Sequence, residues 1–179
     1  ERVLKNAGTP FTILQENESC CGSPILRAGD VETFKTFLNK NLDVIEEKGI
    51  KTVIFSCAGC YDTFKVDYPL YRDYDFRVLH TVEFFDELLE QGKLKLTHDV
   101  PLTVTYHDPC HLGRNAERYE DWNGDVIDLM PLVSINMPAK PKRTGRKGVY
   151  DPPRNILKKI PGLNLIEMER IREYAYCCG

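Results

Sequence analysis

The 179-residue chain contains seven cysteines, and their arrangement is the clearest indication of its chemistry. They form two adjacent pairs, one C-x-x-C motif and one single residue in "HDPCH": Cys20 and Cys21, Cys177 and Cys178, Cys57 and Cys60, and Cys110. Thiolate sulfur is a soft ligand that suits zinc, Cu(I) and iron–sulfur clusters. A C-x-x-C at the start of a helix can also act as a dithiol, because the helix dipole stabilises the thiolate. The cysteines therefore predict metal or redox chemistry.

A disulfide framework is the alternative interpretation of so many cysteines. Adjacent cysteines are poor partners for each other, because Cα atoms about 3.8 Å apart lie below the usual disulfide range of about 4.4–6.8 Å. The count is odd, and no secretory signal is visible, which favours a reducing compartment. Metal or redox chemistry is the stronger interpretation.

Strands and helices alternate along the chain. Short apolar or β-branched runs predict strands at 9–15, 51–56, 76–80 and 163–169, and a further strand that starts at Pro101 and leads into "HDPCH". Helical periodicity and end signals predict three helices. The first has Asp30 as N-cap, an apolar stripe of Val31, Phe34, Leu38 and Ile45, and Gly49 as its stop; the second is capped at Thr81 and ends at Gly92; the third has Asp151 as N-cap and ends at Pro161-Gly162. This order predicts an α/β fold around a mainly parallel sheet.

The cysteines come just after predicted strands. In open α/β sheets, ligands bind at the carboxyl ends of the strands, near helix N-termini. We therefore expect the thiols to gather at such an edge.

Residues 115–147 break the alternation. Their periodicity is weak, Pro131, Pro138 and Pro141 interrupt them, and they end in the basic run "KPKRTGRKG". We interpret this stretch as an inserted loop or flap. A surface excursion without a function is one alternative, and a docking arm or lid is the other.

The formal net charge is −3, whereas nucleic-acid-binding domains are usually basic, so we expect no nucleic-acid partner. No run approaches the about 18 apolar residues of a membrane-spanning helix.

The cysteine motifs together resemble the CCG (cysteine-rich) domain family of heterodisulfide reductase B/D-type subunits and their relatives. In that family a single cysteine, a C-C-G and a C-x-x-C form a repeat that usually occurs twice. The first repeat, expected at 1–100, matches Cys20-Cys21-Gly22 with Cys57 and Cys60 but lacks its first cysteine. The second, expected at 101–179 with an insertion at about 115–147, matches "HDPCHLGR", "GVYDPPRNILKKIPGLNLIEMER" and Cys177-Cys178-Gly179 but lacks its C-x-x-C. The resemblance thus implies two pseudo-repeated α/β subdomains, both incomplete, and a piece of a longer protein. The insertion is also similar to one in the catalytic subunit of the sulfite-reductase-associated electron-transfer complex.

The resemblance also implies the cofactor and the site. Family repeats hold a noncubane [4Fe–4S] cluster that reductively cleaves a disulfide. Carried over to this chain, the cluster ligands are Cys20, Cys21, Cys57 and Cys60 in one site and Cys110, Cys177 and Cys178 in the other, with Cys20, Cys21, Cys177 and Cys178 at the reacting centres. Gly22 and Gly59 are expected to let backbone N–H groups approach sulfur. His107 and His111 are candidate proton sources, although His107 and Asp108 could instead cap a following helix. Arg27, Arg114 and Arg154 could meet an anionic thiol substrate.

The expected function is disulfide reduction by an iron–sulfur oxidoreductase subunit. Its electrons would come from a ferredoxin-type or membrane cytochrome subunit, and its substrate would be a small thiol/disulfide or a protein disulfide. The expected location is cytoplasmic or, through partner subunits, peripheral on the membrane. Two alternatives stay open: an electron-relay subunit of a 2-hydroxy-acid oxidase, and a zinc-stabilised structural module.

Overall fold

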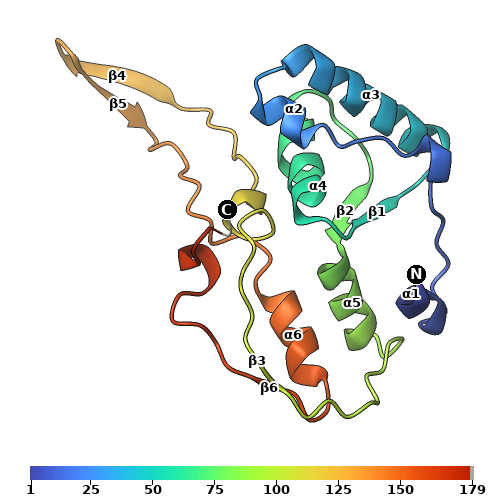
Figure 1. Ribbon diagram of the computed structural model, residues 1–179. Coiled ribbons are helices and arrows are strands. Elements are labelled where there is room, and N and C mark those ends of the chain that lie inside the picture. The colour runs from blue at the N-terminus through green and yellow to red at the C-terminus, as the bar shows by residue number, and fades with distance from the viewer. Residues whose placement is uncertain (178–179) are drawn as a thin grey trace.

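The structure is a computed structural model that describes residues 1–177 (Figure 1). Cys178 and Gly179, which the predicted second site includes, lie outside the described residues. The α-helices are α1 (Arg2–Asn6), α2 (Ser23–Arg27), α3 (Val31–Glu47), α4 (Ala58–Asp62), α5 (Thr81–Glu90) and α6 (Asp151–Lys159). The strands are β1 (Thr52–Phe55), β2 (Arg77–His80), β3 (Thr103–Val104), β4 (Asp125–Met130), β5 (Val133–Met137) and β6 (Asn164–Leu165). Short 3-10 turns lie at Gln15–Asn17, Tyr68–Leu70, Arg114–Ala116 and Arg172–Tyr174, and a π-helical turn at Thr63–Asp67.

The described strands form three two-stranded sheets. β1 pairs with β2 in parallel, and β3 pairs with β6 in parallel, whereas β4 and β5 form an antiparallel pair. Helices α2, α3 and α4 gather around β1 and β2, and α5 and α6 lie beside each other (Figure 1). The predicted α/β class with mainly parallel sheets is confirmed.

Helix α3 supplies most of the core of the region that contains β1. Asp30 caps the helix, because its side chain accepts a hydrogen bond from the backbone N–H of Thr33 at 3.0 Å. The buried face repeats at helical spacing and packs on two aromatic residues from the segment after α4. The buried residues of this core are Cys21, Phe34, Leu38, Leu42, Ile45, Phe64 and Tyr68.

A second core cluster joins α4 to the later part of the chain. Tyr61 of α4 packs with Leu112, Ala116 and Val149, all of them buried. Burial of these apolar side chains holds the C-x-x-C helix against the segment that follows Cys110.

Several predicted element boundaries are wrong. Residues 9–14 form no strand; they have no neighbouring strand among the described residues, and a 3-10 turn begins at Gln15. The N-cap of α5 is His80 rather than Thr81, and the N-cap of α6 is Tyr150 rather than Asp151. The strands predicted from Pro101 and at 163–169 are observed as β3 and β6, which are only two residues long. Each of these two strands pairs with the other and with no further described strand.

The predicted loop or flap at 115–147 contains a regular element that the sequence did not predict. Residues 125–137 form the β4–β5 hairpin, with Pro131 in its turn and Pro138 just beyond its second strand. The prolines thus limit the strands rather than abolish them. The hairpin projects from the rest of the molecule (Figure 1).

Among residues 1–177, no helix is long and apolar enough to cross a membrane.

Candidate metal centre

The first four cysteines lie on two loops that lead into short helices. Gly22 follows the adjacent pair with φ of 79° and serves as the N-cap of α2. Cys57 is the N-cap residue of α4, directly beyond β1, and Cys60 lies inside that helix. The left-handed conformation at Gly22 turns the chain sharply after Cys21, which only glycine does at little cost. Both loops therefore present sulfur beside the start of a helix. Cys57 follows a strand as the sequence predicts, whereas no strand precedes Cys20 and Cys21.

The thiols of these two loops lie near one another. Cys60 packs against the core cluster that contains Cys21, and both residues line one cavity together with Cys57. None of these four residues forms a disulfide. A hydrogen bond with Cys60 lowers the pKa of Cys21 to about 6, and the same bond raises the pKa of Cys60. The sequence-predicted set of Cys20, Cys21, Cys57 and Cys60 is thus brought together in space.

Asn41 and Tyr68 fix the backbone of the adjacent pair, and neither residue was predicted from the sequence. Asn41 donates from Nδ2 to the carbonyl oxygen of Cys20 at 2.9 Å and to the Tyr68 hydroxyl at 3.0 Å. The Tyr68 hydroxyl donates to the carbonyl oxygen of Cys21 at 3.1 Å. Ser19 completes the network by donating to Oδ1 of Asn41 at 2.8 Å. One sequence signal was present: Asn41 interrupts the apolar face of α3, and a buried amide needs partners.

The two predicted glycines, Gly22 and Gly59, lie close to cysteine sulfur atoms. The N–H of Gly22 donates to Sγ of Cys20 at 3.4 Å. A Cβ on Gly59 would lie 3.8 Å from Sγ of Cys57. Backbone N–H groups near thiolates tune the potential of iron–sulfur sites.

A cavity of about 730 Å³ lies beside these thiols. Cys21, Cys57 and Cys60 line it together with apolar side chains of the 9–14 segment and of β1, such as Phe11 and Val53. A space of this size next to the sulfur atoms has room for a cluster or for part of a small substrate.

The second predicted site is described only in part. Sγ of Cys110 lies 4.0 Å from Sγ of Cys177, and the third predicted ligand, Cys178, falls outside the described residues. Arg114 holds the segment before Cys177 by donating to the carbonyl oxygen of Ala175 at 2.8 Å. Two cysteines that are 67 residues apart in sequence are therefore neighbours.

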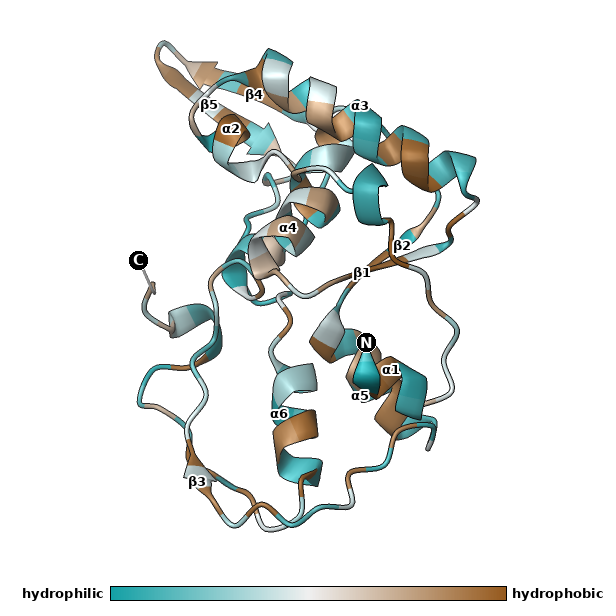
Figure 2. Ribbon diagram, turned by 45° about the vertical axis from the view of Figure 1, so that its right-hand side comes forward, coloured by the Kyte–Doolittle hydropathy of each residue, from teal (hydrophilic) through white to brown (hydrophobic). Residues whose placement is uncertain are grey.

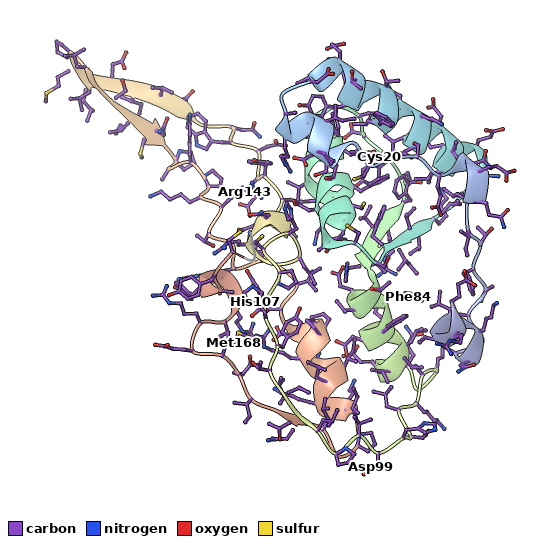
Figure 3. All side chains as sticks on the ribbon, in the orientation of Figure 1. Cys20, Phe84, Asp99, His107, Arg143 and Met168 are labelled. Atoms are coloured by element: carbon purple, nitrogen blue, oxygen red, sulfur yellow. The ribbon has the colours of Figure 1, made fainter. Side chains whose placement is uncertain are left out.

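The histidines of "HDPCH" differ from one another. Nε2 of His107 is buried without a hydrogen-bond partner among the described residues. His107 and Asp108 do not cap a helix; Asp108 instead accepts from Arg154 and from the backbone N–H of Arg172. His111 pairs through Nδ1 with Oδ2 of Asp62, on the helix that carries Cys60. In Figure 3, His107 lies apart from Cys20, which is among the helices around the first sheet.

The three candidate arginines all contact groups of the protein itself, and a contact with an anionic substrate stays a prediction. Arg27 pairs with Asp67 at 2.7 Å, and Arg114 donates to backbone carbonyls. Arg154 is buried and donates to Asp108, to Glu167 and to the carbonyl oxygen of Tyr150. Their positive charges are neutralised or directed at the protein itself.

The donor atoms of this site are thiolate sulfurs. Within residues 1–177, no three His, Cys, Asp or Glu side chains stand close enough together to hold one ion. Thiolates of Cys20, Cys21, Cys57 and Cys60 would suit an iron–sulfur cluster and also zinc.

The sequence comparisons agree with this donor chemistry. The CCG cysteine-rich domain family matches residues 1–65 and 143–179, more than half of the chain. The chain therefore belongs to the CCG cysteine-rich domain family. No solved structure matches it.

Curated relatives include components of oxidoreductases. The chain is 37 % identical over 183 residues to the D-type subunit of the dihydromethanophenazine:CoB–CoM heterodisulfide reductase of Methanosarcina acetivorans, covering 99 % of this chain and 37 % of that protein. It is 34 % identical to the probable iron-sulfur-binding oxidoreductase FadF of Bacillus subtilis, covering 99 % of this chain and 21 % of FadF. It is 32 % identical to the EtfAB:quinone oxidoreductase of Syntrophomonas wolfei, covering 99 % of this chain and 20 % of that protein. The chain thus spans only a fifth to about two fifths of the length of these relatives.

Proposed function

We propose that this chain is the cluster-holding part of an iron–sulfur oxidoreductase subunit that reduces a disulfide with electrons from a partner subunit. The observation that carries the proposal is the convergence of Cys21, Cys57 and Cys60, with Cys20 adjacent in sequence, at the lining of one cavity. The names of the heterodisulfide reductase and of FadF among the relatives support an iron–sulfur oxidoreductase.

The proposed cofactor is a noncubane [4Fe–4S] cluster held by these four cysteines. A second cluster would be held by Cys110, Cys177 and Cys178. The division into repeats at 1–100 and 101–179 belongs to the same proposal. It is supported by the two parallel strand pairs, β1 with β2 and β3 with β6, one from each proposed repeat.

When bound, such a cluster supplies one-electron transfer and an iron position open to a substrate sulfur. Reduction of a disulfide consumes two electrons and two protons, breaks the S–S bond and yields two thiols. The thiolates of the chain would hold the iron, its backbone N–H groups would point at sulfur, and the neighbouring cavity would admit the substrate. Asn41 and Tyr68 position Cys20 and Cys21 through their carbonyl groups.

Protons would be delivered by the histidines near Cys110. His111 contacts the Asp62 carboxylate at 2.7 Å, and burial raises the pKa of Asp62 although the His111 hydrogen bond acts in the opposite direction. Both groups are suited to hold a proton near the site.

The proposed partners are a ferredoxin-type or membrane cytochrome subunit as electron donor, and a small or protein disulfide as substrate. A cytoplasmic location, with membrane contact through partner subunits, belongs to this proposal. Relay of electrons within a 2-hydroxy-acid oxidase is the second candidate, because the same thiol cluster would serve it. A flavin-dependent hydroxy-acid dehydrogenase that co-purifies with the protein would favour the relay.

Metal and sulfide analysis tests the proposal. Protein purified without oxygen should contain iron and acid-labile sulfide and absorb in the visible region. Cys60→Ser, which removes one of the proposed sulfur ligands, should lose most of the iron, whereas Ser56→Ala in the same loop should keep it. Colourless protein with stoichiometric zinc and no iron would overturn the cluster and favour a zinc-stabilised module.

The disulfide step has its own test. Chemically reduced protein mixed with a small disulfide should release two thiols for every two electrons consumed. Iron-loaded protein that releases no thiol from any disulfide offered would favour electron relay.

A further inference from the structure

The β4–β5 hairpin exposes more large apolar side chains than any other segment of the described chain. Their exposed fractions run from 38 % at Ile135 to 105 % at Leu132. The exposed residues are Val126, Ile127, Leu129, Met130, Leu132, Val133, Ile135 and Met137. Brown stretches along the hairpin in Figure 2 mark the same feature. Contiguous apolar surface of this kind marks an interaction site.

The strand register separates the hairpin into an apolar and a polar face. Ile127 pairs with Ile135, and the β-bulge between Asp128 and Met130 brings Met130 opposite Val133. Side chains alternate along a strand and paired residues share a face, so these four residues and Met137 line one side, with Asp125, the partner of Met137, at the stem end of that side.

The opposite side carries mostly polar residues. Asp128 pairs with Ser134, whose hydroxyl donates to its carboxylate at 2.5 Å, and Val126 pairs with Asn136. The hairpin therefore has one apolar face and one mostly polar face. A hairpin with both faces in water would have no reason to carry an apolar face.

The two segments that flank the hairpin, which we call its stem, place cations over aromatic rings. Nζ of Lys140 lies 4.6 Å from the ring centre of Trp122, and the Arg143 guanidinium lies 4.2 Å from that of Tyr119. Nε1 of Trp122 donates to the carbonyl oxygen of Pro138 at 2.7 Å and closes the stem. Trp and Tyr combined with Lys and Arg are the side chains typical of the membrane–water interface.

The charge of the stem is uneven. The arm that returns from β5, residues 138–147, contains five Lys and Arg residues and no acidic residue. On the other arm, Glu120 pairs with Lys147, and Glu117 accepts from the backbone N–H of Gly145. Arg146 of the returning arm is also paired, with Glu173 at 3.5 Å, so Lys140, Lys142 and Arg143 are the cations of this arm that remain to meet phosphate headgroups.

We propose that the β4–β5 hairpin lies in the surface of a lipid bilayer that contains anionic lipid. Its apolar face and its tip at Leu132 enter the boundary between headgroups and acyl chains, and Asp128, Ser134 and Asn136 face water. The outer edges of a two-stranded hairpin carry unpaired backbone groups, so the hairpin stays at the interface, where headgroups and water satisfy them. The stem places Trp122 and Lys140 at headgroup level. In Figure 1 the hairpin projects away from the body of the molecule, and in Figure 3 the labelled Cys20 lies among the helices of that body.

Trp122 makes the proposal directly testable, because it is the single tryptophan of the chain. Vesicles of phosphatidylcholine mixed with phosphatidylglycerol should bind the iron-loaded protein in a flotation assay and shift its tryptophan emission to shorter wavelength. Pure phosphatidylcholine vesicles or high salt should weaken binding, because the stem cations are then unmatched or screened.

A variant of the tip removes the apolar surface and keeps the hairpin. Leu132 has φ of 70°, a conformation that Asn tolerates, and Thr suits a strand at position 130. Met130→Thr with Leu132→Asn should lower the vesicle partition coefficient by at least about tenfold. Asn136→Thr, on the polar face, is the matched control and should keep native binding.

Three results would overturn the proposal. One is vesicle binding that Met130→Thr with Leu132→Asn leaves unchanged. Another is an unshifted Trp122 emission at saturating anionic vesicles. The last is a native protein that ignores vesicles but dimerises with a concentration dependence that the tip variant abolishes, which would assign the apolar face to a second copy of the chain.

Discussion

The guanidinium of Arg154 and the carboxylate of Asp108 form a buried, two-pronged ion pair with both N–O distances at 2.7 Å. The side chains are 4 % and 2 % exposed. Burial acts to raise the pKa of Asp108, but hydrogen bonds from Arg154 and from the backbone N–H of Arg172 hold that pKa below its usual value. The pair joins the "HDPCH" loop to helix α6 and to the segment that leads to Cys177.

Removing one member of this pair should destabilise the fold strongly. Arg154→Met leaves Asp108 buried and unpaired, and we expect the free energy of unfolding to fall by about 3–5 kcal/mol. Urea unfolding followed by circular dichroism measures the change. Arg77→Met, which removes an exposed partner of Glu87, is the control and should cost no more than about 1 kcal/mol. Equal losses in the two variants would contradict the structural role of the buried pair.

Replacement of Tyr68 should reduce iron retention by more than the loss of unfolding free energy alone explains. Tyr68→Phe removes the donor to the Cys21 carbonyl and should cost about 1–2 kcal/mol of unfolding free energy. Under the proposed function it should also lose iron faster under a chelator. Tyr74→Phe, whose hydroxyl donates to the carbonyl oxygen of Phe64, is the matched control: it should show a similar stability loss with native iron retention. Equal iron loss in both variants would mean that Tyr68 does not position the adjacent cysteines.

Gly22 should be far less replaceable than Gly29. Both have positive φ, but a Cβ at Gly22 would lie 2.8 Å from Cδ2 of the buried Phe34, whereas a Cβ at Gly29 meets nothing within 4 Å. Gly29→Ala should cost about 1–2 kcal/mol for the left-handed backbone alone, and Gly22→Ala should cost more because Phe34 cannot move away. Thermal unfolding of the two variants compares them, and a smaller loss for Gly22→Ala would refute the close approach.

His80 should make stability depend on pH below 6.5. Burial lowers the pKa of His80 from 6.5, so the unfolded chain binds this proton more readily than the folded chain. The stability at this site is complete above pH 6.5 and decreases as the pH falls through that value. His80→Asn keeps an acceptor for the N–H of Val82 and should flatten the decrease in the free energy of unfolding between neutral and mildly acidic pH. A slope identical to that of the native protein would exclude His80 as its source.

Local chemistry is what the sequence predicts well. Asp30 and the stripe of Phe34, Leu38 and Ile45 define α3, because capping and helical spacing act within a few residues. The β-branched run at 51–56 and the run at 76–80 define β1 and β2 for a similar reason. Residues 9–14 fail as a strand because pairing depends on a neighbour that the local sequence cannot specify.

The donor chemistry, seven thiols in vicinal, C-x-x-C and single positions, and the family to which they belong can be recognised without a structure. Which of these groups meet depends on tertiary contacts. Contacts between distant residues place Cys60 near Cys21 and Cys110 near Cys177. They also pair Arg154 with Asp108, and they let Asn41 and Tyr68 hold the adjacent cysteines. Tertiary structure also turned a proline-interrupted stretch into an amphipathic hairpin, because strand register, which is a property of two paired segments, separates the apolar from the polar face.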